Sequence, residues 1–133
     1  MDNGRITIHC DVQDTVLGNY GPTNEAQLIL AFMQAAIDHG HEAQMVSTIG
    51  RENDLILSLE FEGIIDPFIP TLKKQQDGRH IECDILIDND PIVQPFNAIA
   101  KHWIDPNAPN LASKLETIAR DVLGFAFKAP IHT

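Results

Sequence analysis

"ITIHCDVQDTVLG", residues 6–18, decides how this chain is interpreted, because an apolar run ends abruptly in an acid. β-Branched and apolar residues dominate residues 5–12, which predicts a strand, and a turn-rich stretch follows. A strand that is apolar on both faces is usually central in a parallel sheet. Ligands of open α/β sheets bind at the carboxyl ends of such strands. Asp11 is therefore a candidate reactive carboxylate, although polar residues also end strands as ordinary turn residues.

The same pattern returns in "HIECDILIDND", residues 80–90, where a second apolar run stops at three polar residues. If the two runs form neighbouring parallel strands, Asp11 and Asp88 converge at one edge of the sheet. Adjacent carboxylates repel each other unless one is protonated or a cation bridges them. Mg²⁺ prefers oxygen ligands and is the expected bridge.

Apolar periodicity and turn residues predict the remaining elements. Residues 55–62 alternate as a half-buried strand does, but residues 52–61 would equally suit a short helix. Two prolines argue against a long helix in residues 66–74. Trp103 is expected to anchor the C-terminal helix. The other expected elements are a helix that begins near Asn24, with Gln27 in capping-box spacing, and ends at Gly40, a strand over 42–49, a partly helical stretch over 91–103, and a helix over 110–124 that Asn110 caps and Gly124 closes.

Length and composition indicate one soluble domain over residues 1–133, since 44% of the residues are hydrophobic. No apolar stretch approaches the roughly 20 residues of a membrane-spanning helix. The N-terminal residues do not form a secretory signal, so a cytoplasmic location is expected. With 19 acidic residues against 9 Lys and Arg, the net charge is −10, and binding to nucleic-acid backbones is not expected.

The two cysteines, Cys10 and Cys83, lie in apolar runs without the spacing of a zinc site and are expected to be reduced core thiols. If Asp11 and Asp88 are level on adjacent strands, the cysteines are four residues out of register. That offset is about 13 Å at ~3.3 Å per residue. A disulfide needs Cα atoms within about 7 Å, so none is expected.

Four motifs occur in order along residues 5–90, and together they indicate a family. They are "CDVQDTVLG" (10–18) with Asp11 and Thr15, "DHGHEAQMVSTIG" (38–50) with Ser47, "DPFIPTLKK" (66–74) with Lys73 or Lys74, and "CDILIDND" (83–90) with Asp88 and Asn89 or Asp90. This order resembles the haloacid dehalogenase-like (HAD) hydrolase superfamily. The resemblance implies a doubly wound, mainly parallel α/β sheet in a three-layer α/β/α arrangement, and an aspartyl-phosphate intermediate.

The resemblance also implies a role for each matching residue in a Mg²⁺-dependent phosphohydrolase. Asp11 would be the nucleophile and a metal ligand, the main-chain carbonyl of Gln13 a second ligand, and Asp88 a third. Ser47 would hydrogen-bond a transferring oxygen. Lys74, or its neighbour Lys73, would neutralise the charge that develops there.

Gln13 departs from the family pattern, because family phosphatases carry an acid at this place that protonates the leaving alkoxide. Loss of general acid catalysis typically lowers the rate about 10²–10⁴-fold. Asp14 is one residue further on and should point elsewhere. Three outcomes stay open: a phosphatase for substrates with good leaving groups, another HAD chemistry, or a degenerate, inactive protein.

The spacing between the motifs leaves no room for an inserted cap domain. Capless family members have open sites, so the expected partners are a phosphorylated small molecule, a larger phosphorylated substrate, or a second copy in a homo-oligomer. The loop 17–23, "LGNYGPT", would form a flap with Tyr20 as a candidate substrate contact.

An alternative architecture takes residues 55–62 as a strand that follows the strand over 42–49. The order then corresponds to a ferredoxin-like α/β sandwich. With this acidic surface, such a fold would suit a non-enzymatic binding, immunity or inhibitor protein.

Overall fold

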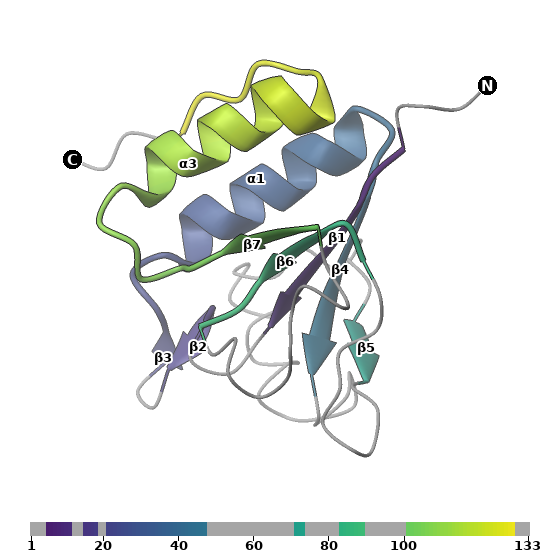
Figure 1. Ribbon diagram of the computed structural model, residues 1–133. Helices are drawn as coiled ribbons and strands as arrows, with labels where there is room; N and C mark the ends of the chain where they lie inside the picture. Colours follow the sequence, from purple (N-terminus) through teal and green to yellow (C-terminus); the bar gives the residue numbers. More distant parts are fainter. Residues whose placement is uncertain are drawn as a thin grey trace.

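The computed structural model describes residues 5–11, 15–18, 21–47, 71–73, 83–89 and 101–129. Five of its strands form one sheet in the order β5-β4-β1-β6-β7, and every pairing in that sheet is parallel (Figure 1). The mainly parallel α/β sheet expected from the sequence is thereby confirmed. The strands are β1 (Thr7–Asp11), β4 (Glu42–Ser47), β5 (Thr71–Lys73), β6 (Ile85–Ile87) and β7 (His102–Ile104).

The strand order reverses at the centre of the sheet. From β1 the chain passes through helix α1 (Ala26–Asp38) to β4 and then β5 on one side. It then returns to the other side of β1 to form β6 and β7. The boundary between β1 and β6 is therefore the topological switch point, where open α/β sheets bind their ligands beyond the carboxyl ends of the strands.

The ferredoxin-like alternative is wrong. It needs the segment directly after β4 to return as its neighbour, and consecutive strands joined by a short turn pair antiparallel. β4 instead lies between β1 and β5 and pairs in parallel with both.

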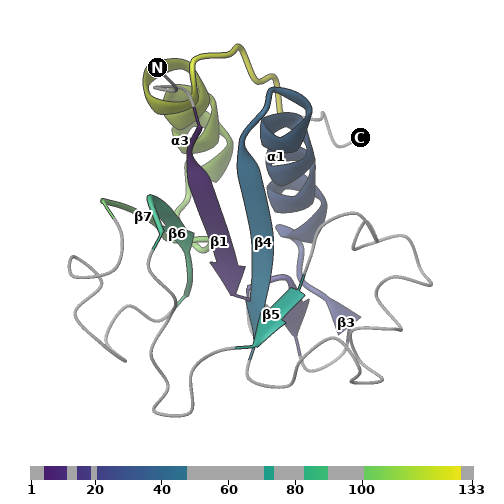
Figure 2. The ribbon, with the colours of Figure 1, turned by 90° about the vertical axis from the view of Figure 1, so that its right-hand side faces the viewer.

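Both described helices pack on the same face of the sheet, as Figures 1 and 2 show. They are α1 and α3 (Leu111–Ile118), which continues as a π-helical segment over Ala119–Leu123. On the opposite face of the strands, His9 and Leu86 are also buried. The second helical layer of the expected three-layer arrangement would have to come from residues outside those described.

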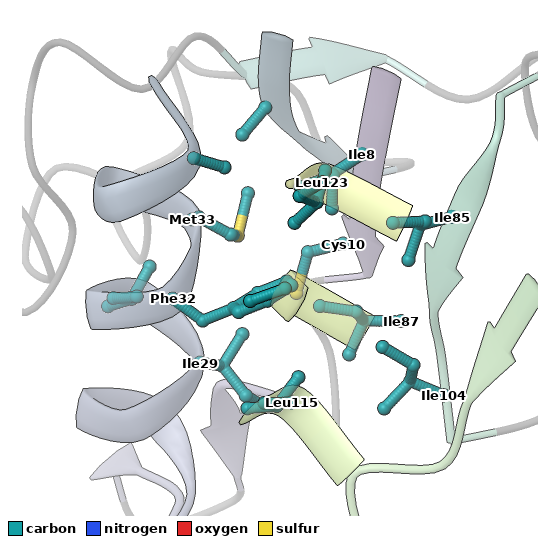
Figure 3. Packing of buried hydrophobic residues seen from close by; sticks show 14 of the residues in the cluster. Ile8, Cys10, Ile29, Phe32, Met33, Ile85, Ile87, Ile104, Leu115 and Leu123 are labelled. Carbon is teal, nitrogen blue, oxygen red and sulfur yellow. The ribbon is translucent and has the colours of Figure 1, made fainter. Parts of the chain in front are cut away.

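The core lies between the two helices and the sheet (Figure 3). Residues of α1 at helical spacing and alternate residues of the central strands point toward one another there, which explains why each element forms where it does. Complete burial of one such side chain contributes about 1.5–3 kcal/mol. Fully buried members include Ile8, Cys10, Ile29, Phe32, Met33, Ile85, Ile87 and Leu115.

Several expectations about element ends are wrong. Helix α1 begins at Ala26, and Glu25 is its N-cap without a side-chain cap hydrogen bond, so the capping box at Asn24 does not form. Asn110 occupies the N-cap of α3 but likewise makes no side-chain cap bond. The C-terminal ends are as expected, since Gly40 (φ 91°) and Gly124 (φ 80°) adopt the left-handed conformation that glycine favours.

Two short strands were not expected. Residues 102–104 form β7 where a partly helical stretch is predicted from the sequence, and 71–73 form β5 in the proline-containing segment. Each has three residues, too few to show a hydrophobic period. The question of strand or helix over residues 52–61 lies outside the described residues.

A β-hairpin follows β1 where a flap is expected. Its strands are β2 (Leu17–Gly18) and β3 (Gly21–Pro22), which pair antiparallel. Figure 1 shows this hairpin at the end of the sheet toward which β1 and β6 run. Tyr20, the proposed substrate contact, lies outside the described residues. Among the described helices, none has the length and apolar character needed to cross a membrane.

Candidate functional site

Asp11 and Asp88 lie side by side at the switch point. The register pairs Ile8 with Ile85 and Cys10 with Ile87, so the next residues along, Asp11 and Asp88, are level. Neighbouring strands are about 4.8 Å apart, which sets the scale of the separation between the two main chains. We refer to Asp11 and Asp88 as the acid pair.

Both members of the acid pair are buried, with exposed fractions of 4% for Asp11 and 3% for Asp88. Burial raises the pKa of the neighbouring Cys10 thiol well above its ordinary value, and the carboxylates of Asp11 and Asp88 raise it further. Two carboxylates this close in a buried setting repel each other unless a proton or a positive charge compensates them.

Thr15 connects the acid pair to the hairpin. Its hydroxyl lies 3.5 Å from Asp11 Oδ2 and 3.4 Å from Asn89 Oδ1, and it is fully buried. Its main-chain carbonyl accepts a hydrogen bond of 2.7 Å from the Thr23 hydroxyl. The end of β1, the end of β6 and the base of the hairpin therefore meet at one side chain.

Strand β7 holds the main chain of Asp88. The Asp88 N–H donates to the Ile104 carbonyl at 3.2 Å, and the Asp88 carbonyl accepts from Trp103 Nε1 at 2.8 Å. By continuation of the register, Asp105 is level with Asp88. Its Oδ1 accepts the Asn107 N–H at 2.9 Å, however, so this carboxylate stabilises the turn after β7.

The expectation that Trp103 anchors the C-terminal helix stays a prediction, whereas the partly helical stretch predicted to include it needs correction. Trp103 belongs to β7, not to a helical stretch, and its N–H bonds to the acid pair's strand. It does line a cavity of about 300 Å³ together with α3 residues that include Ser113 and Thr117.

Of the remaining predicted site residues, the structure places the main chains of Ser47 and Lys73. Ser47 ends β4 one residue beyond the level of Asp11, since Asp11 pairs with Val46. Lys73 ends β5 and is level with Ser47, which puts its main chain about 10 Å from β1 across two strand spacings. The side chains of Ser47 and Lys73 lie outside what the structure describes, as do Gln13 and Lys74 entirely.

The donor chemistry of the acid pair fits a hard divalent cation. Mg²⁺ is commonly held through one or two carboxylates and keeps several of its waters. Within the described ranges, no group of three or more His, Cys, Asp or Glu side chains could hold a metal. Among the described residues, Asp11 and Asp88 are the carboxylates that would bind a Mg²⁺ ion here.

Reasoning from the sequence missed the role of Trp103 and predicted that of Thr15 only as part of a motif. A signal for Trp103 does exist in "HWIDP", residues 102–106, where an apolar pair ends in an acid as the β1 and β6 runs do. With three strand residues, that signal was too short to distinguish from the end of a helix.

Comparison of the chain with protein-family models, curated proteins and solved structures finds no significant match.

Proposed function

We propose that the protein is a Mg²⁺-dependent phosphohydrolase of the HAD-like type, with Asp11 as the nucleophile. One observation carries the proposal: two buried carboxylates, 77 residues apart by their numbering (88 − 11), lie level on adjacent parallel strands. Carboxylates are rarely buried without a compensating partner or a function.

Two further observations support it. The strand order reverses between the strands that carry Asp11 and Asp88, which is where doubly wound sheets bind ligands. A β-hairpin follows β1 directly, as a flap over an otherwise open site would.

The reaction would proceed in two displacements at phosphorus. One Asp11 carboxylate oxygen attacks, a new P–O bond forms, and the bond to the leaving group breaks with its electron pair going to the leaving oxygen. A water then attacks the phosphorus of the aspartyl phosphate, and the P–O bond to Asp11 breaks with its electron pair returning to the carboxylate. The water's oxygen stays on the released inorganic phosphate, and its protons stay there or pass to solvent. The Thr15 hydroxyl, 3.5 Å from Asp11 Oδ2, would orient the carboxylate for attack.

Asp11 and Asp88 would hold the Mg²⁺, which when bound would supply positive charge next to the phosphoryl oxygens. Ser47 and Lys74 remain the candidates to contact those oxygens, as the motifs imply.

The substrate class follows from Gln13. An amide cannot protonate a departing alkoxide, so the enzyme should act best on phosphates whose leaving group is stable without a proton. Acyl and aryl phosphates meet this requirement, whereas alkyl phosphates do not.

Metal binding is the first test of the proposal. Mg²⁺ should raise the melting temperature of the wild-type protein, because a ligand that binds the folded state stabilises it. Asp11→Asn should remove most of that increase. The matched control is Asp84→Asn, since Asp84 lies at the opposite end of the same strand as Asp88 and accepts the Thr7 N–H. Equal Mg²⁺ effects in all three proteins would contradict the acid pair as the site.

Turnover is the second test. Phosphate release from a panel of acyl, aryl and alkyl phosphates should exceed that of Asp11→Asn, with rates highest for the acyl and aryl compounds. If the wild type binds Mg²⁺ but releases no phosphate above the Asp11→Asn level, a degenerate binding protein becomes the better account.

A further inference from the structure

The ladder of hydrogen bonds between β6 and β7 is interrupted at Asp88. In a parallel pair, a residue level with residue j donates its N–H to the carbonyl of j−1 and accepts from the N–H of j+1. Asp88 is level with Asp105 by continuation of the register, and its N–H does donate to the Ile104 carbonyl at 3.2 Å. The donor expected for its carbonyl is therefore the main-chain N–H of residue 106.

Residue 106 is a proline and has no N–H to give. A buried carbonyl left without a donor would cost free energy, and its direction would no longer be defined. The Asp88 carbonyl instead accepts a hydrogen bond of 2.8 Å from Trp103 Nε1. The indole group thus stands where the ladder's next N–H would be.

We propose that Trp103 is a positioning residue for the acid pair: its indole N–H replaces the donor that Pro106 lacks and fixes the main chain of Asp88. One consequence, that the Asp88 carboxylate stays oriented toward Mg²⁺, rests on the proposed function. The hydrogen bond itself belongs to the fold and can be tested without metal.

The direct test is amide hydrogen exchange in Trp103→Phe, a variant that keeps a ring but removes the N–H. The Asp88 amide should exchange at least about 10-fold faster than in the wild type, because the Asp88 carbonyl has lost the hydrogen bond from Trp103 Nε1. Exchange at Leu86, two residues earlier in β6, should be unaffected. Unchanged exchange at Asp88 would overturn the proposal.

The decisive variant is the double substitution Trp103→Phe with Pro106→Ala. Alanine restores a main-chain N–H at residue 106, so slow exchange at Asp88 should return, whereas Pro106→Ala alone should resemble the wild type. Failure of the double variant to recover would mean that Trp103 acts through packing alone and would overturn the proposal.

Mg²⁺ affinity, measured by calorimetry on the same four proteins, should follow the same order. Loss of a group that orients a metal ligand typically weakens binding about 10- to 100-fold, and Trp103→Phe should fall in that range. Ile37→Val, which trims a partly buried side chain in the last turn of α1 that packs against the core, controls for general destabilisation and should bind Mg²⁺ as the wild type does. If the wild type itself fails to bind Mg²⁺, the proposed function is wrong, and the exchange data alone decide the role of Trp103.

Discussion

Asp84 and Asp88 flank strand β6, one on each side, and their positions give the same residue type two different roles. Asp84 precedes β6, where its Oδ2 accepts the Thr7 N–H at 2.9 Å and its Oδ1 lies 3.8 Å from Lys101 Nζ. It joins the amino ends of the strands and is partly exposed. Asp88 follows β6, is buried, and adjoins Asp11. Only the second position lies where parallel sheets bind ligands.

His41 connects three segments that are far apart in sequence. Its Nδ1 accepts the Ile6 N–H at 3.0 Å, and its Nε2 lies 2.8 Å from the Leu123 carbonyl. Since a main-chain N–H can only donate and a carbonyl can only accept, the ring is neutral with its proton on Nε2.

His41→Leu should lower the free energy of unfolding by about 2–4 kcal/mol, because it leaves two main-chain groups without partners. Urea denaturation measures the change. The control is Gln27→Leu on the exposed side of α1, where a change within about 1 kcal/mol is expected. Similar losses in both variants would contradict the connecting role of His41.

Cys10 makes stability depend on pH in the alkaline range. Because its pKa is raised in the folded state, the thiol keeps its proton there while the unfolded chain loses it above about pH 9. The unfolded state then binds fewer protons, so the free energy of unfolding falls as the pH rises above that value. Cys10→Ala should flatten the decline between about pH 8.5 and 10, as measured by urea titrations at several pH values. Parallel curves for the two proteins would count against this explanation.

At the scale of elements, the C-terminal helix ends in an unusual way. After Ile118 the α-helical pattern gives way to a π-helical segment over Ala119–Leu123, and Gly124 closes it with φ 80°. The chain then turns back, with the Phe125 N–H donating to the Ala119 carbonyl at 3.1 Å. This turn places Phe125 against His39, with ring centroids 4.2 Å apart.

Gly124→Ala should lower the free energy of unfolding by about 1–2 kcal/mol, because a Cβ atom disfavours the left-handed conformation. A Cβ at this position would meet no atom within 4 Å, so the loss reflects the backbone alone. Gly124→Asn should lose less, since asparagine tolerates this conformation. Chemical denaturation compares the two, and an equal loss would point to a cause other than the backbone angle.

At the scale of the whole molecule, one side chain joins α1 to the sheet and to the C-terminal segment. Phe32 is fully buried on α1, faces Cys10 and its neighbours on the strands, and meets Phe127 edge to face at 5.6 Å (Figure 3). It therefore contacts both the sheet side of the core and the C-terminal segment.

Phe32→Ala should cost about 3–5 kcal/mol, the usual range for a large cavity in a core. That is a large share of the stability of a domain of this size, so partial unfolding at 37 °C is expected. Thermal melting followed by circular dichroism measures it. Gln27→Ala on the exposed side of the same helix should change stability by no more than about 0.5 kcal/mol.

Local patterns in the sequence were sufficient for β1, β4, β6, α1 and α3, and for the two acids that end apolar runs. These elements are long or strongly apolar, so a short window of sequence over each one is enough to detect its hydrophobic pattern.

Only the tertiary structure decided the strand order, the strands β5 and β7, and the part played by Trp103. β5 and β7 become strands through their neighbours and not through their own short sequences. Hydrogen bonds between distant segments set the register that brings Asp88 beside Asp11. The same register lets the Trp103 indole N–H donate to the Asp88 carbonyl, to which Pro106 has no N–H to donate. Pairing between strands is a long-range interaction, and no short stretch of sequence contains it.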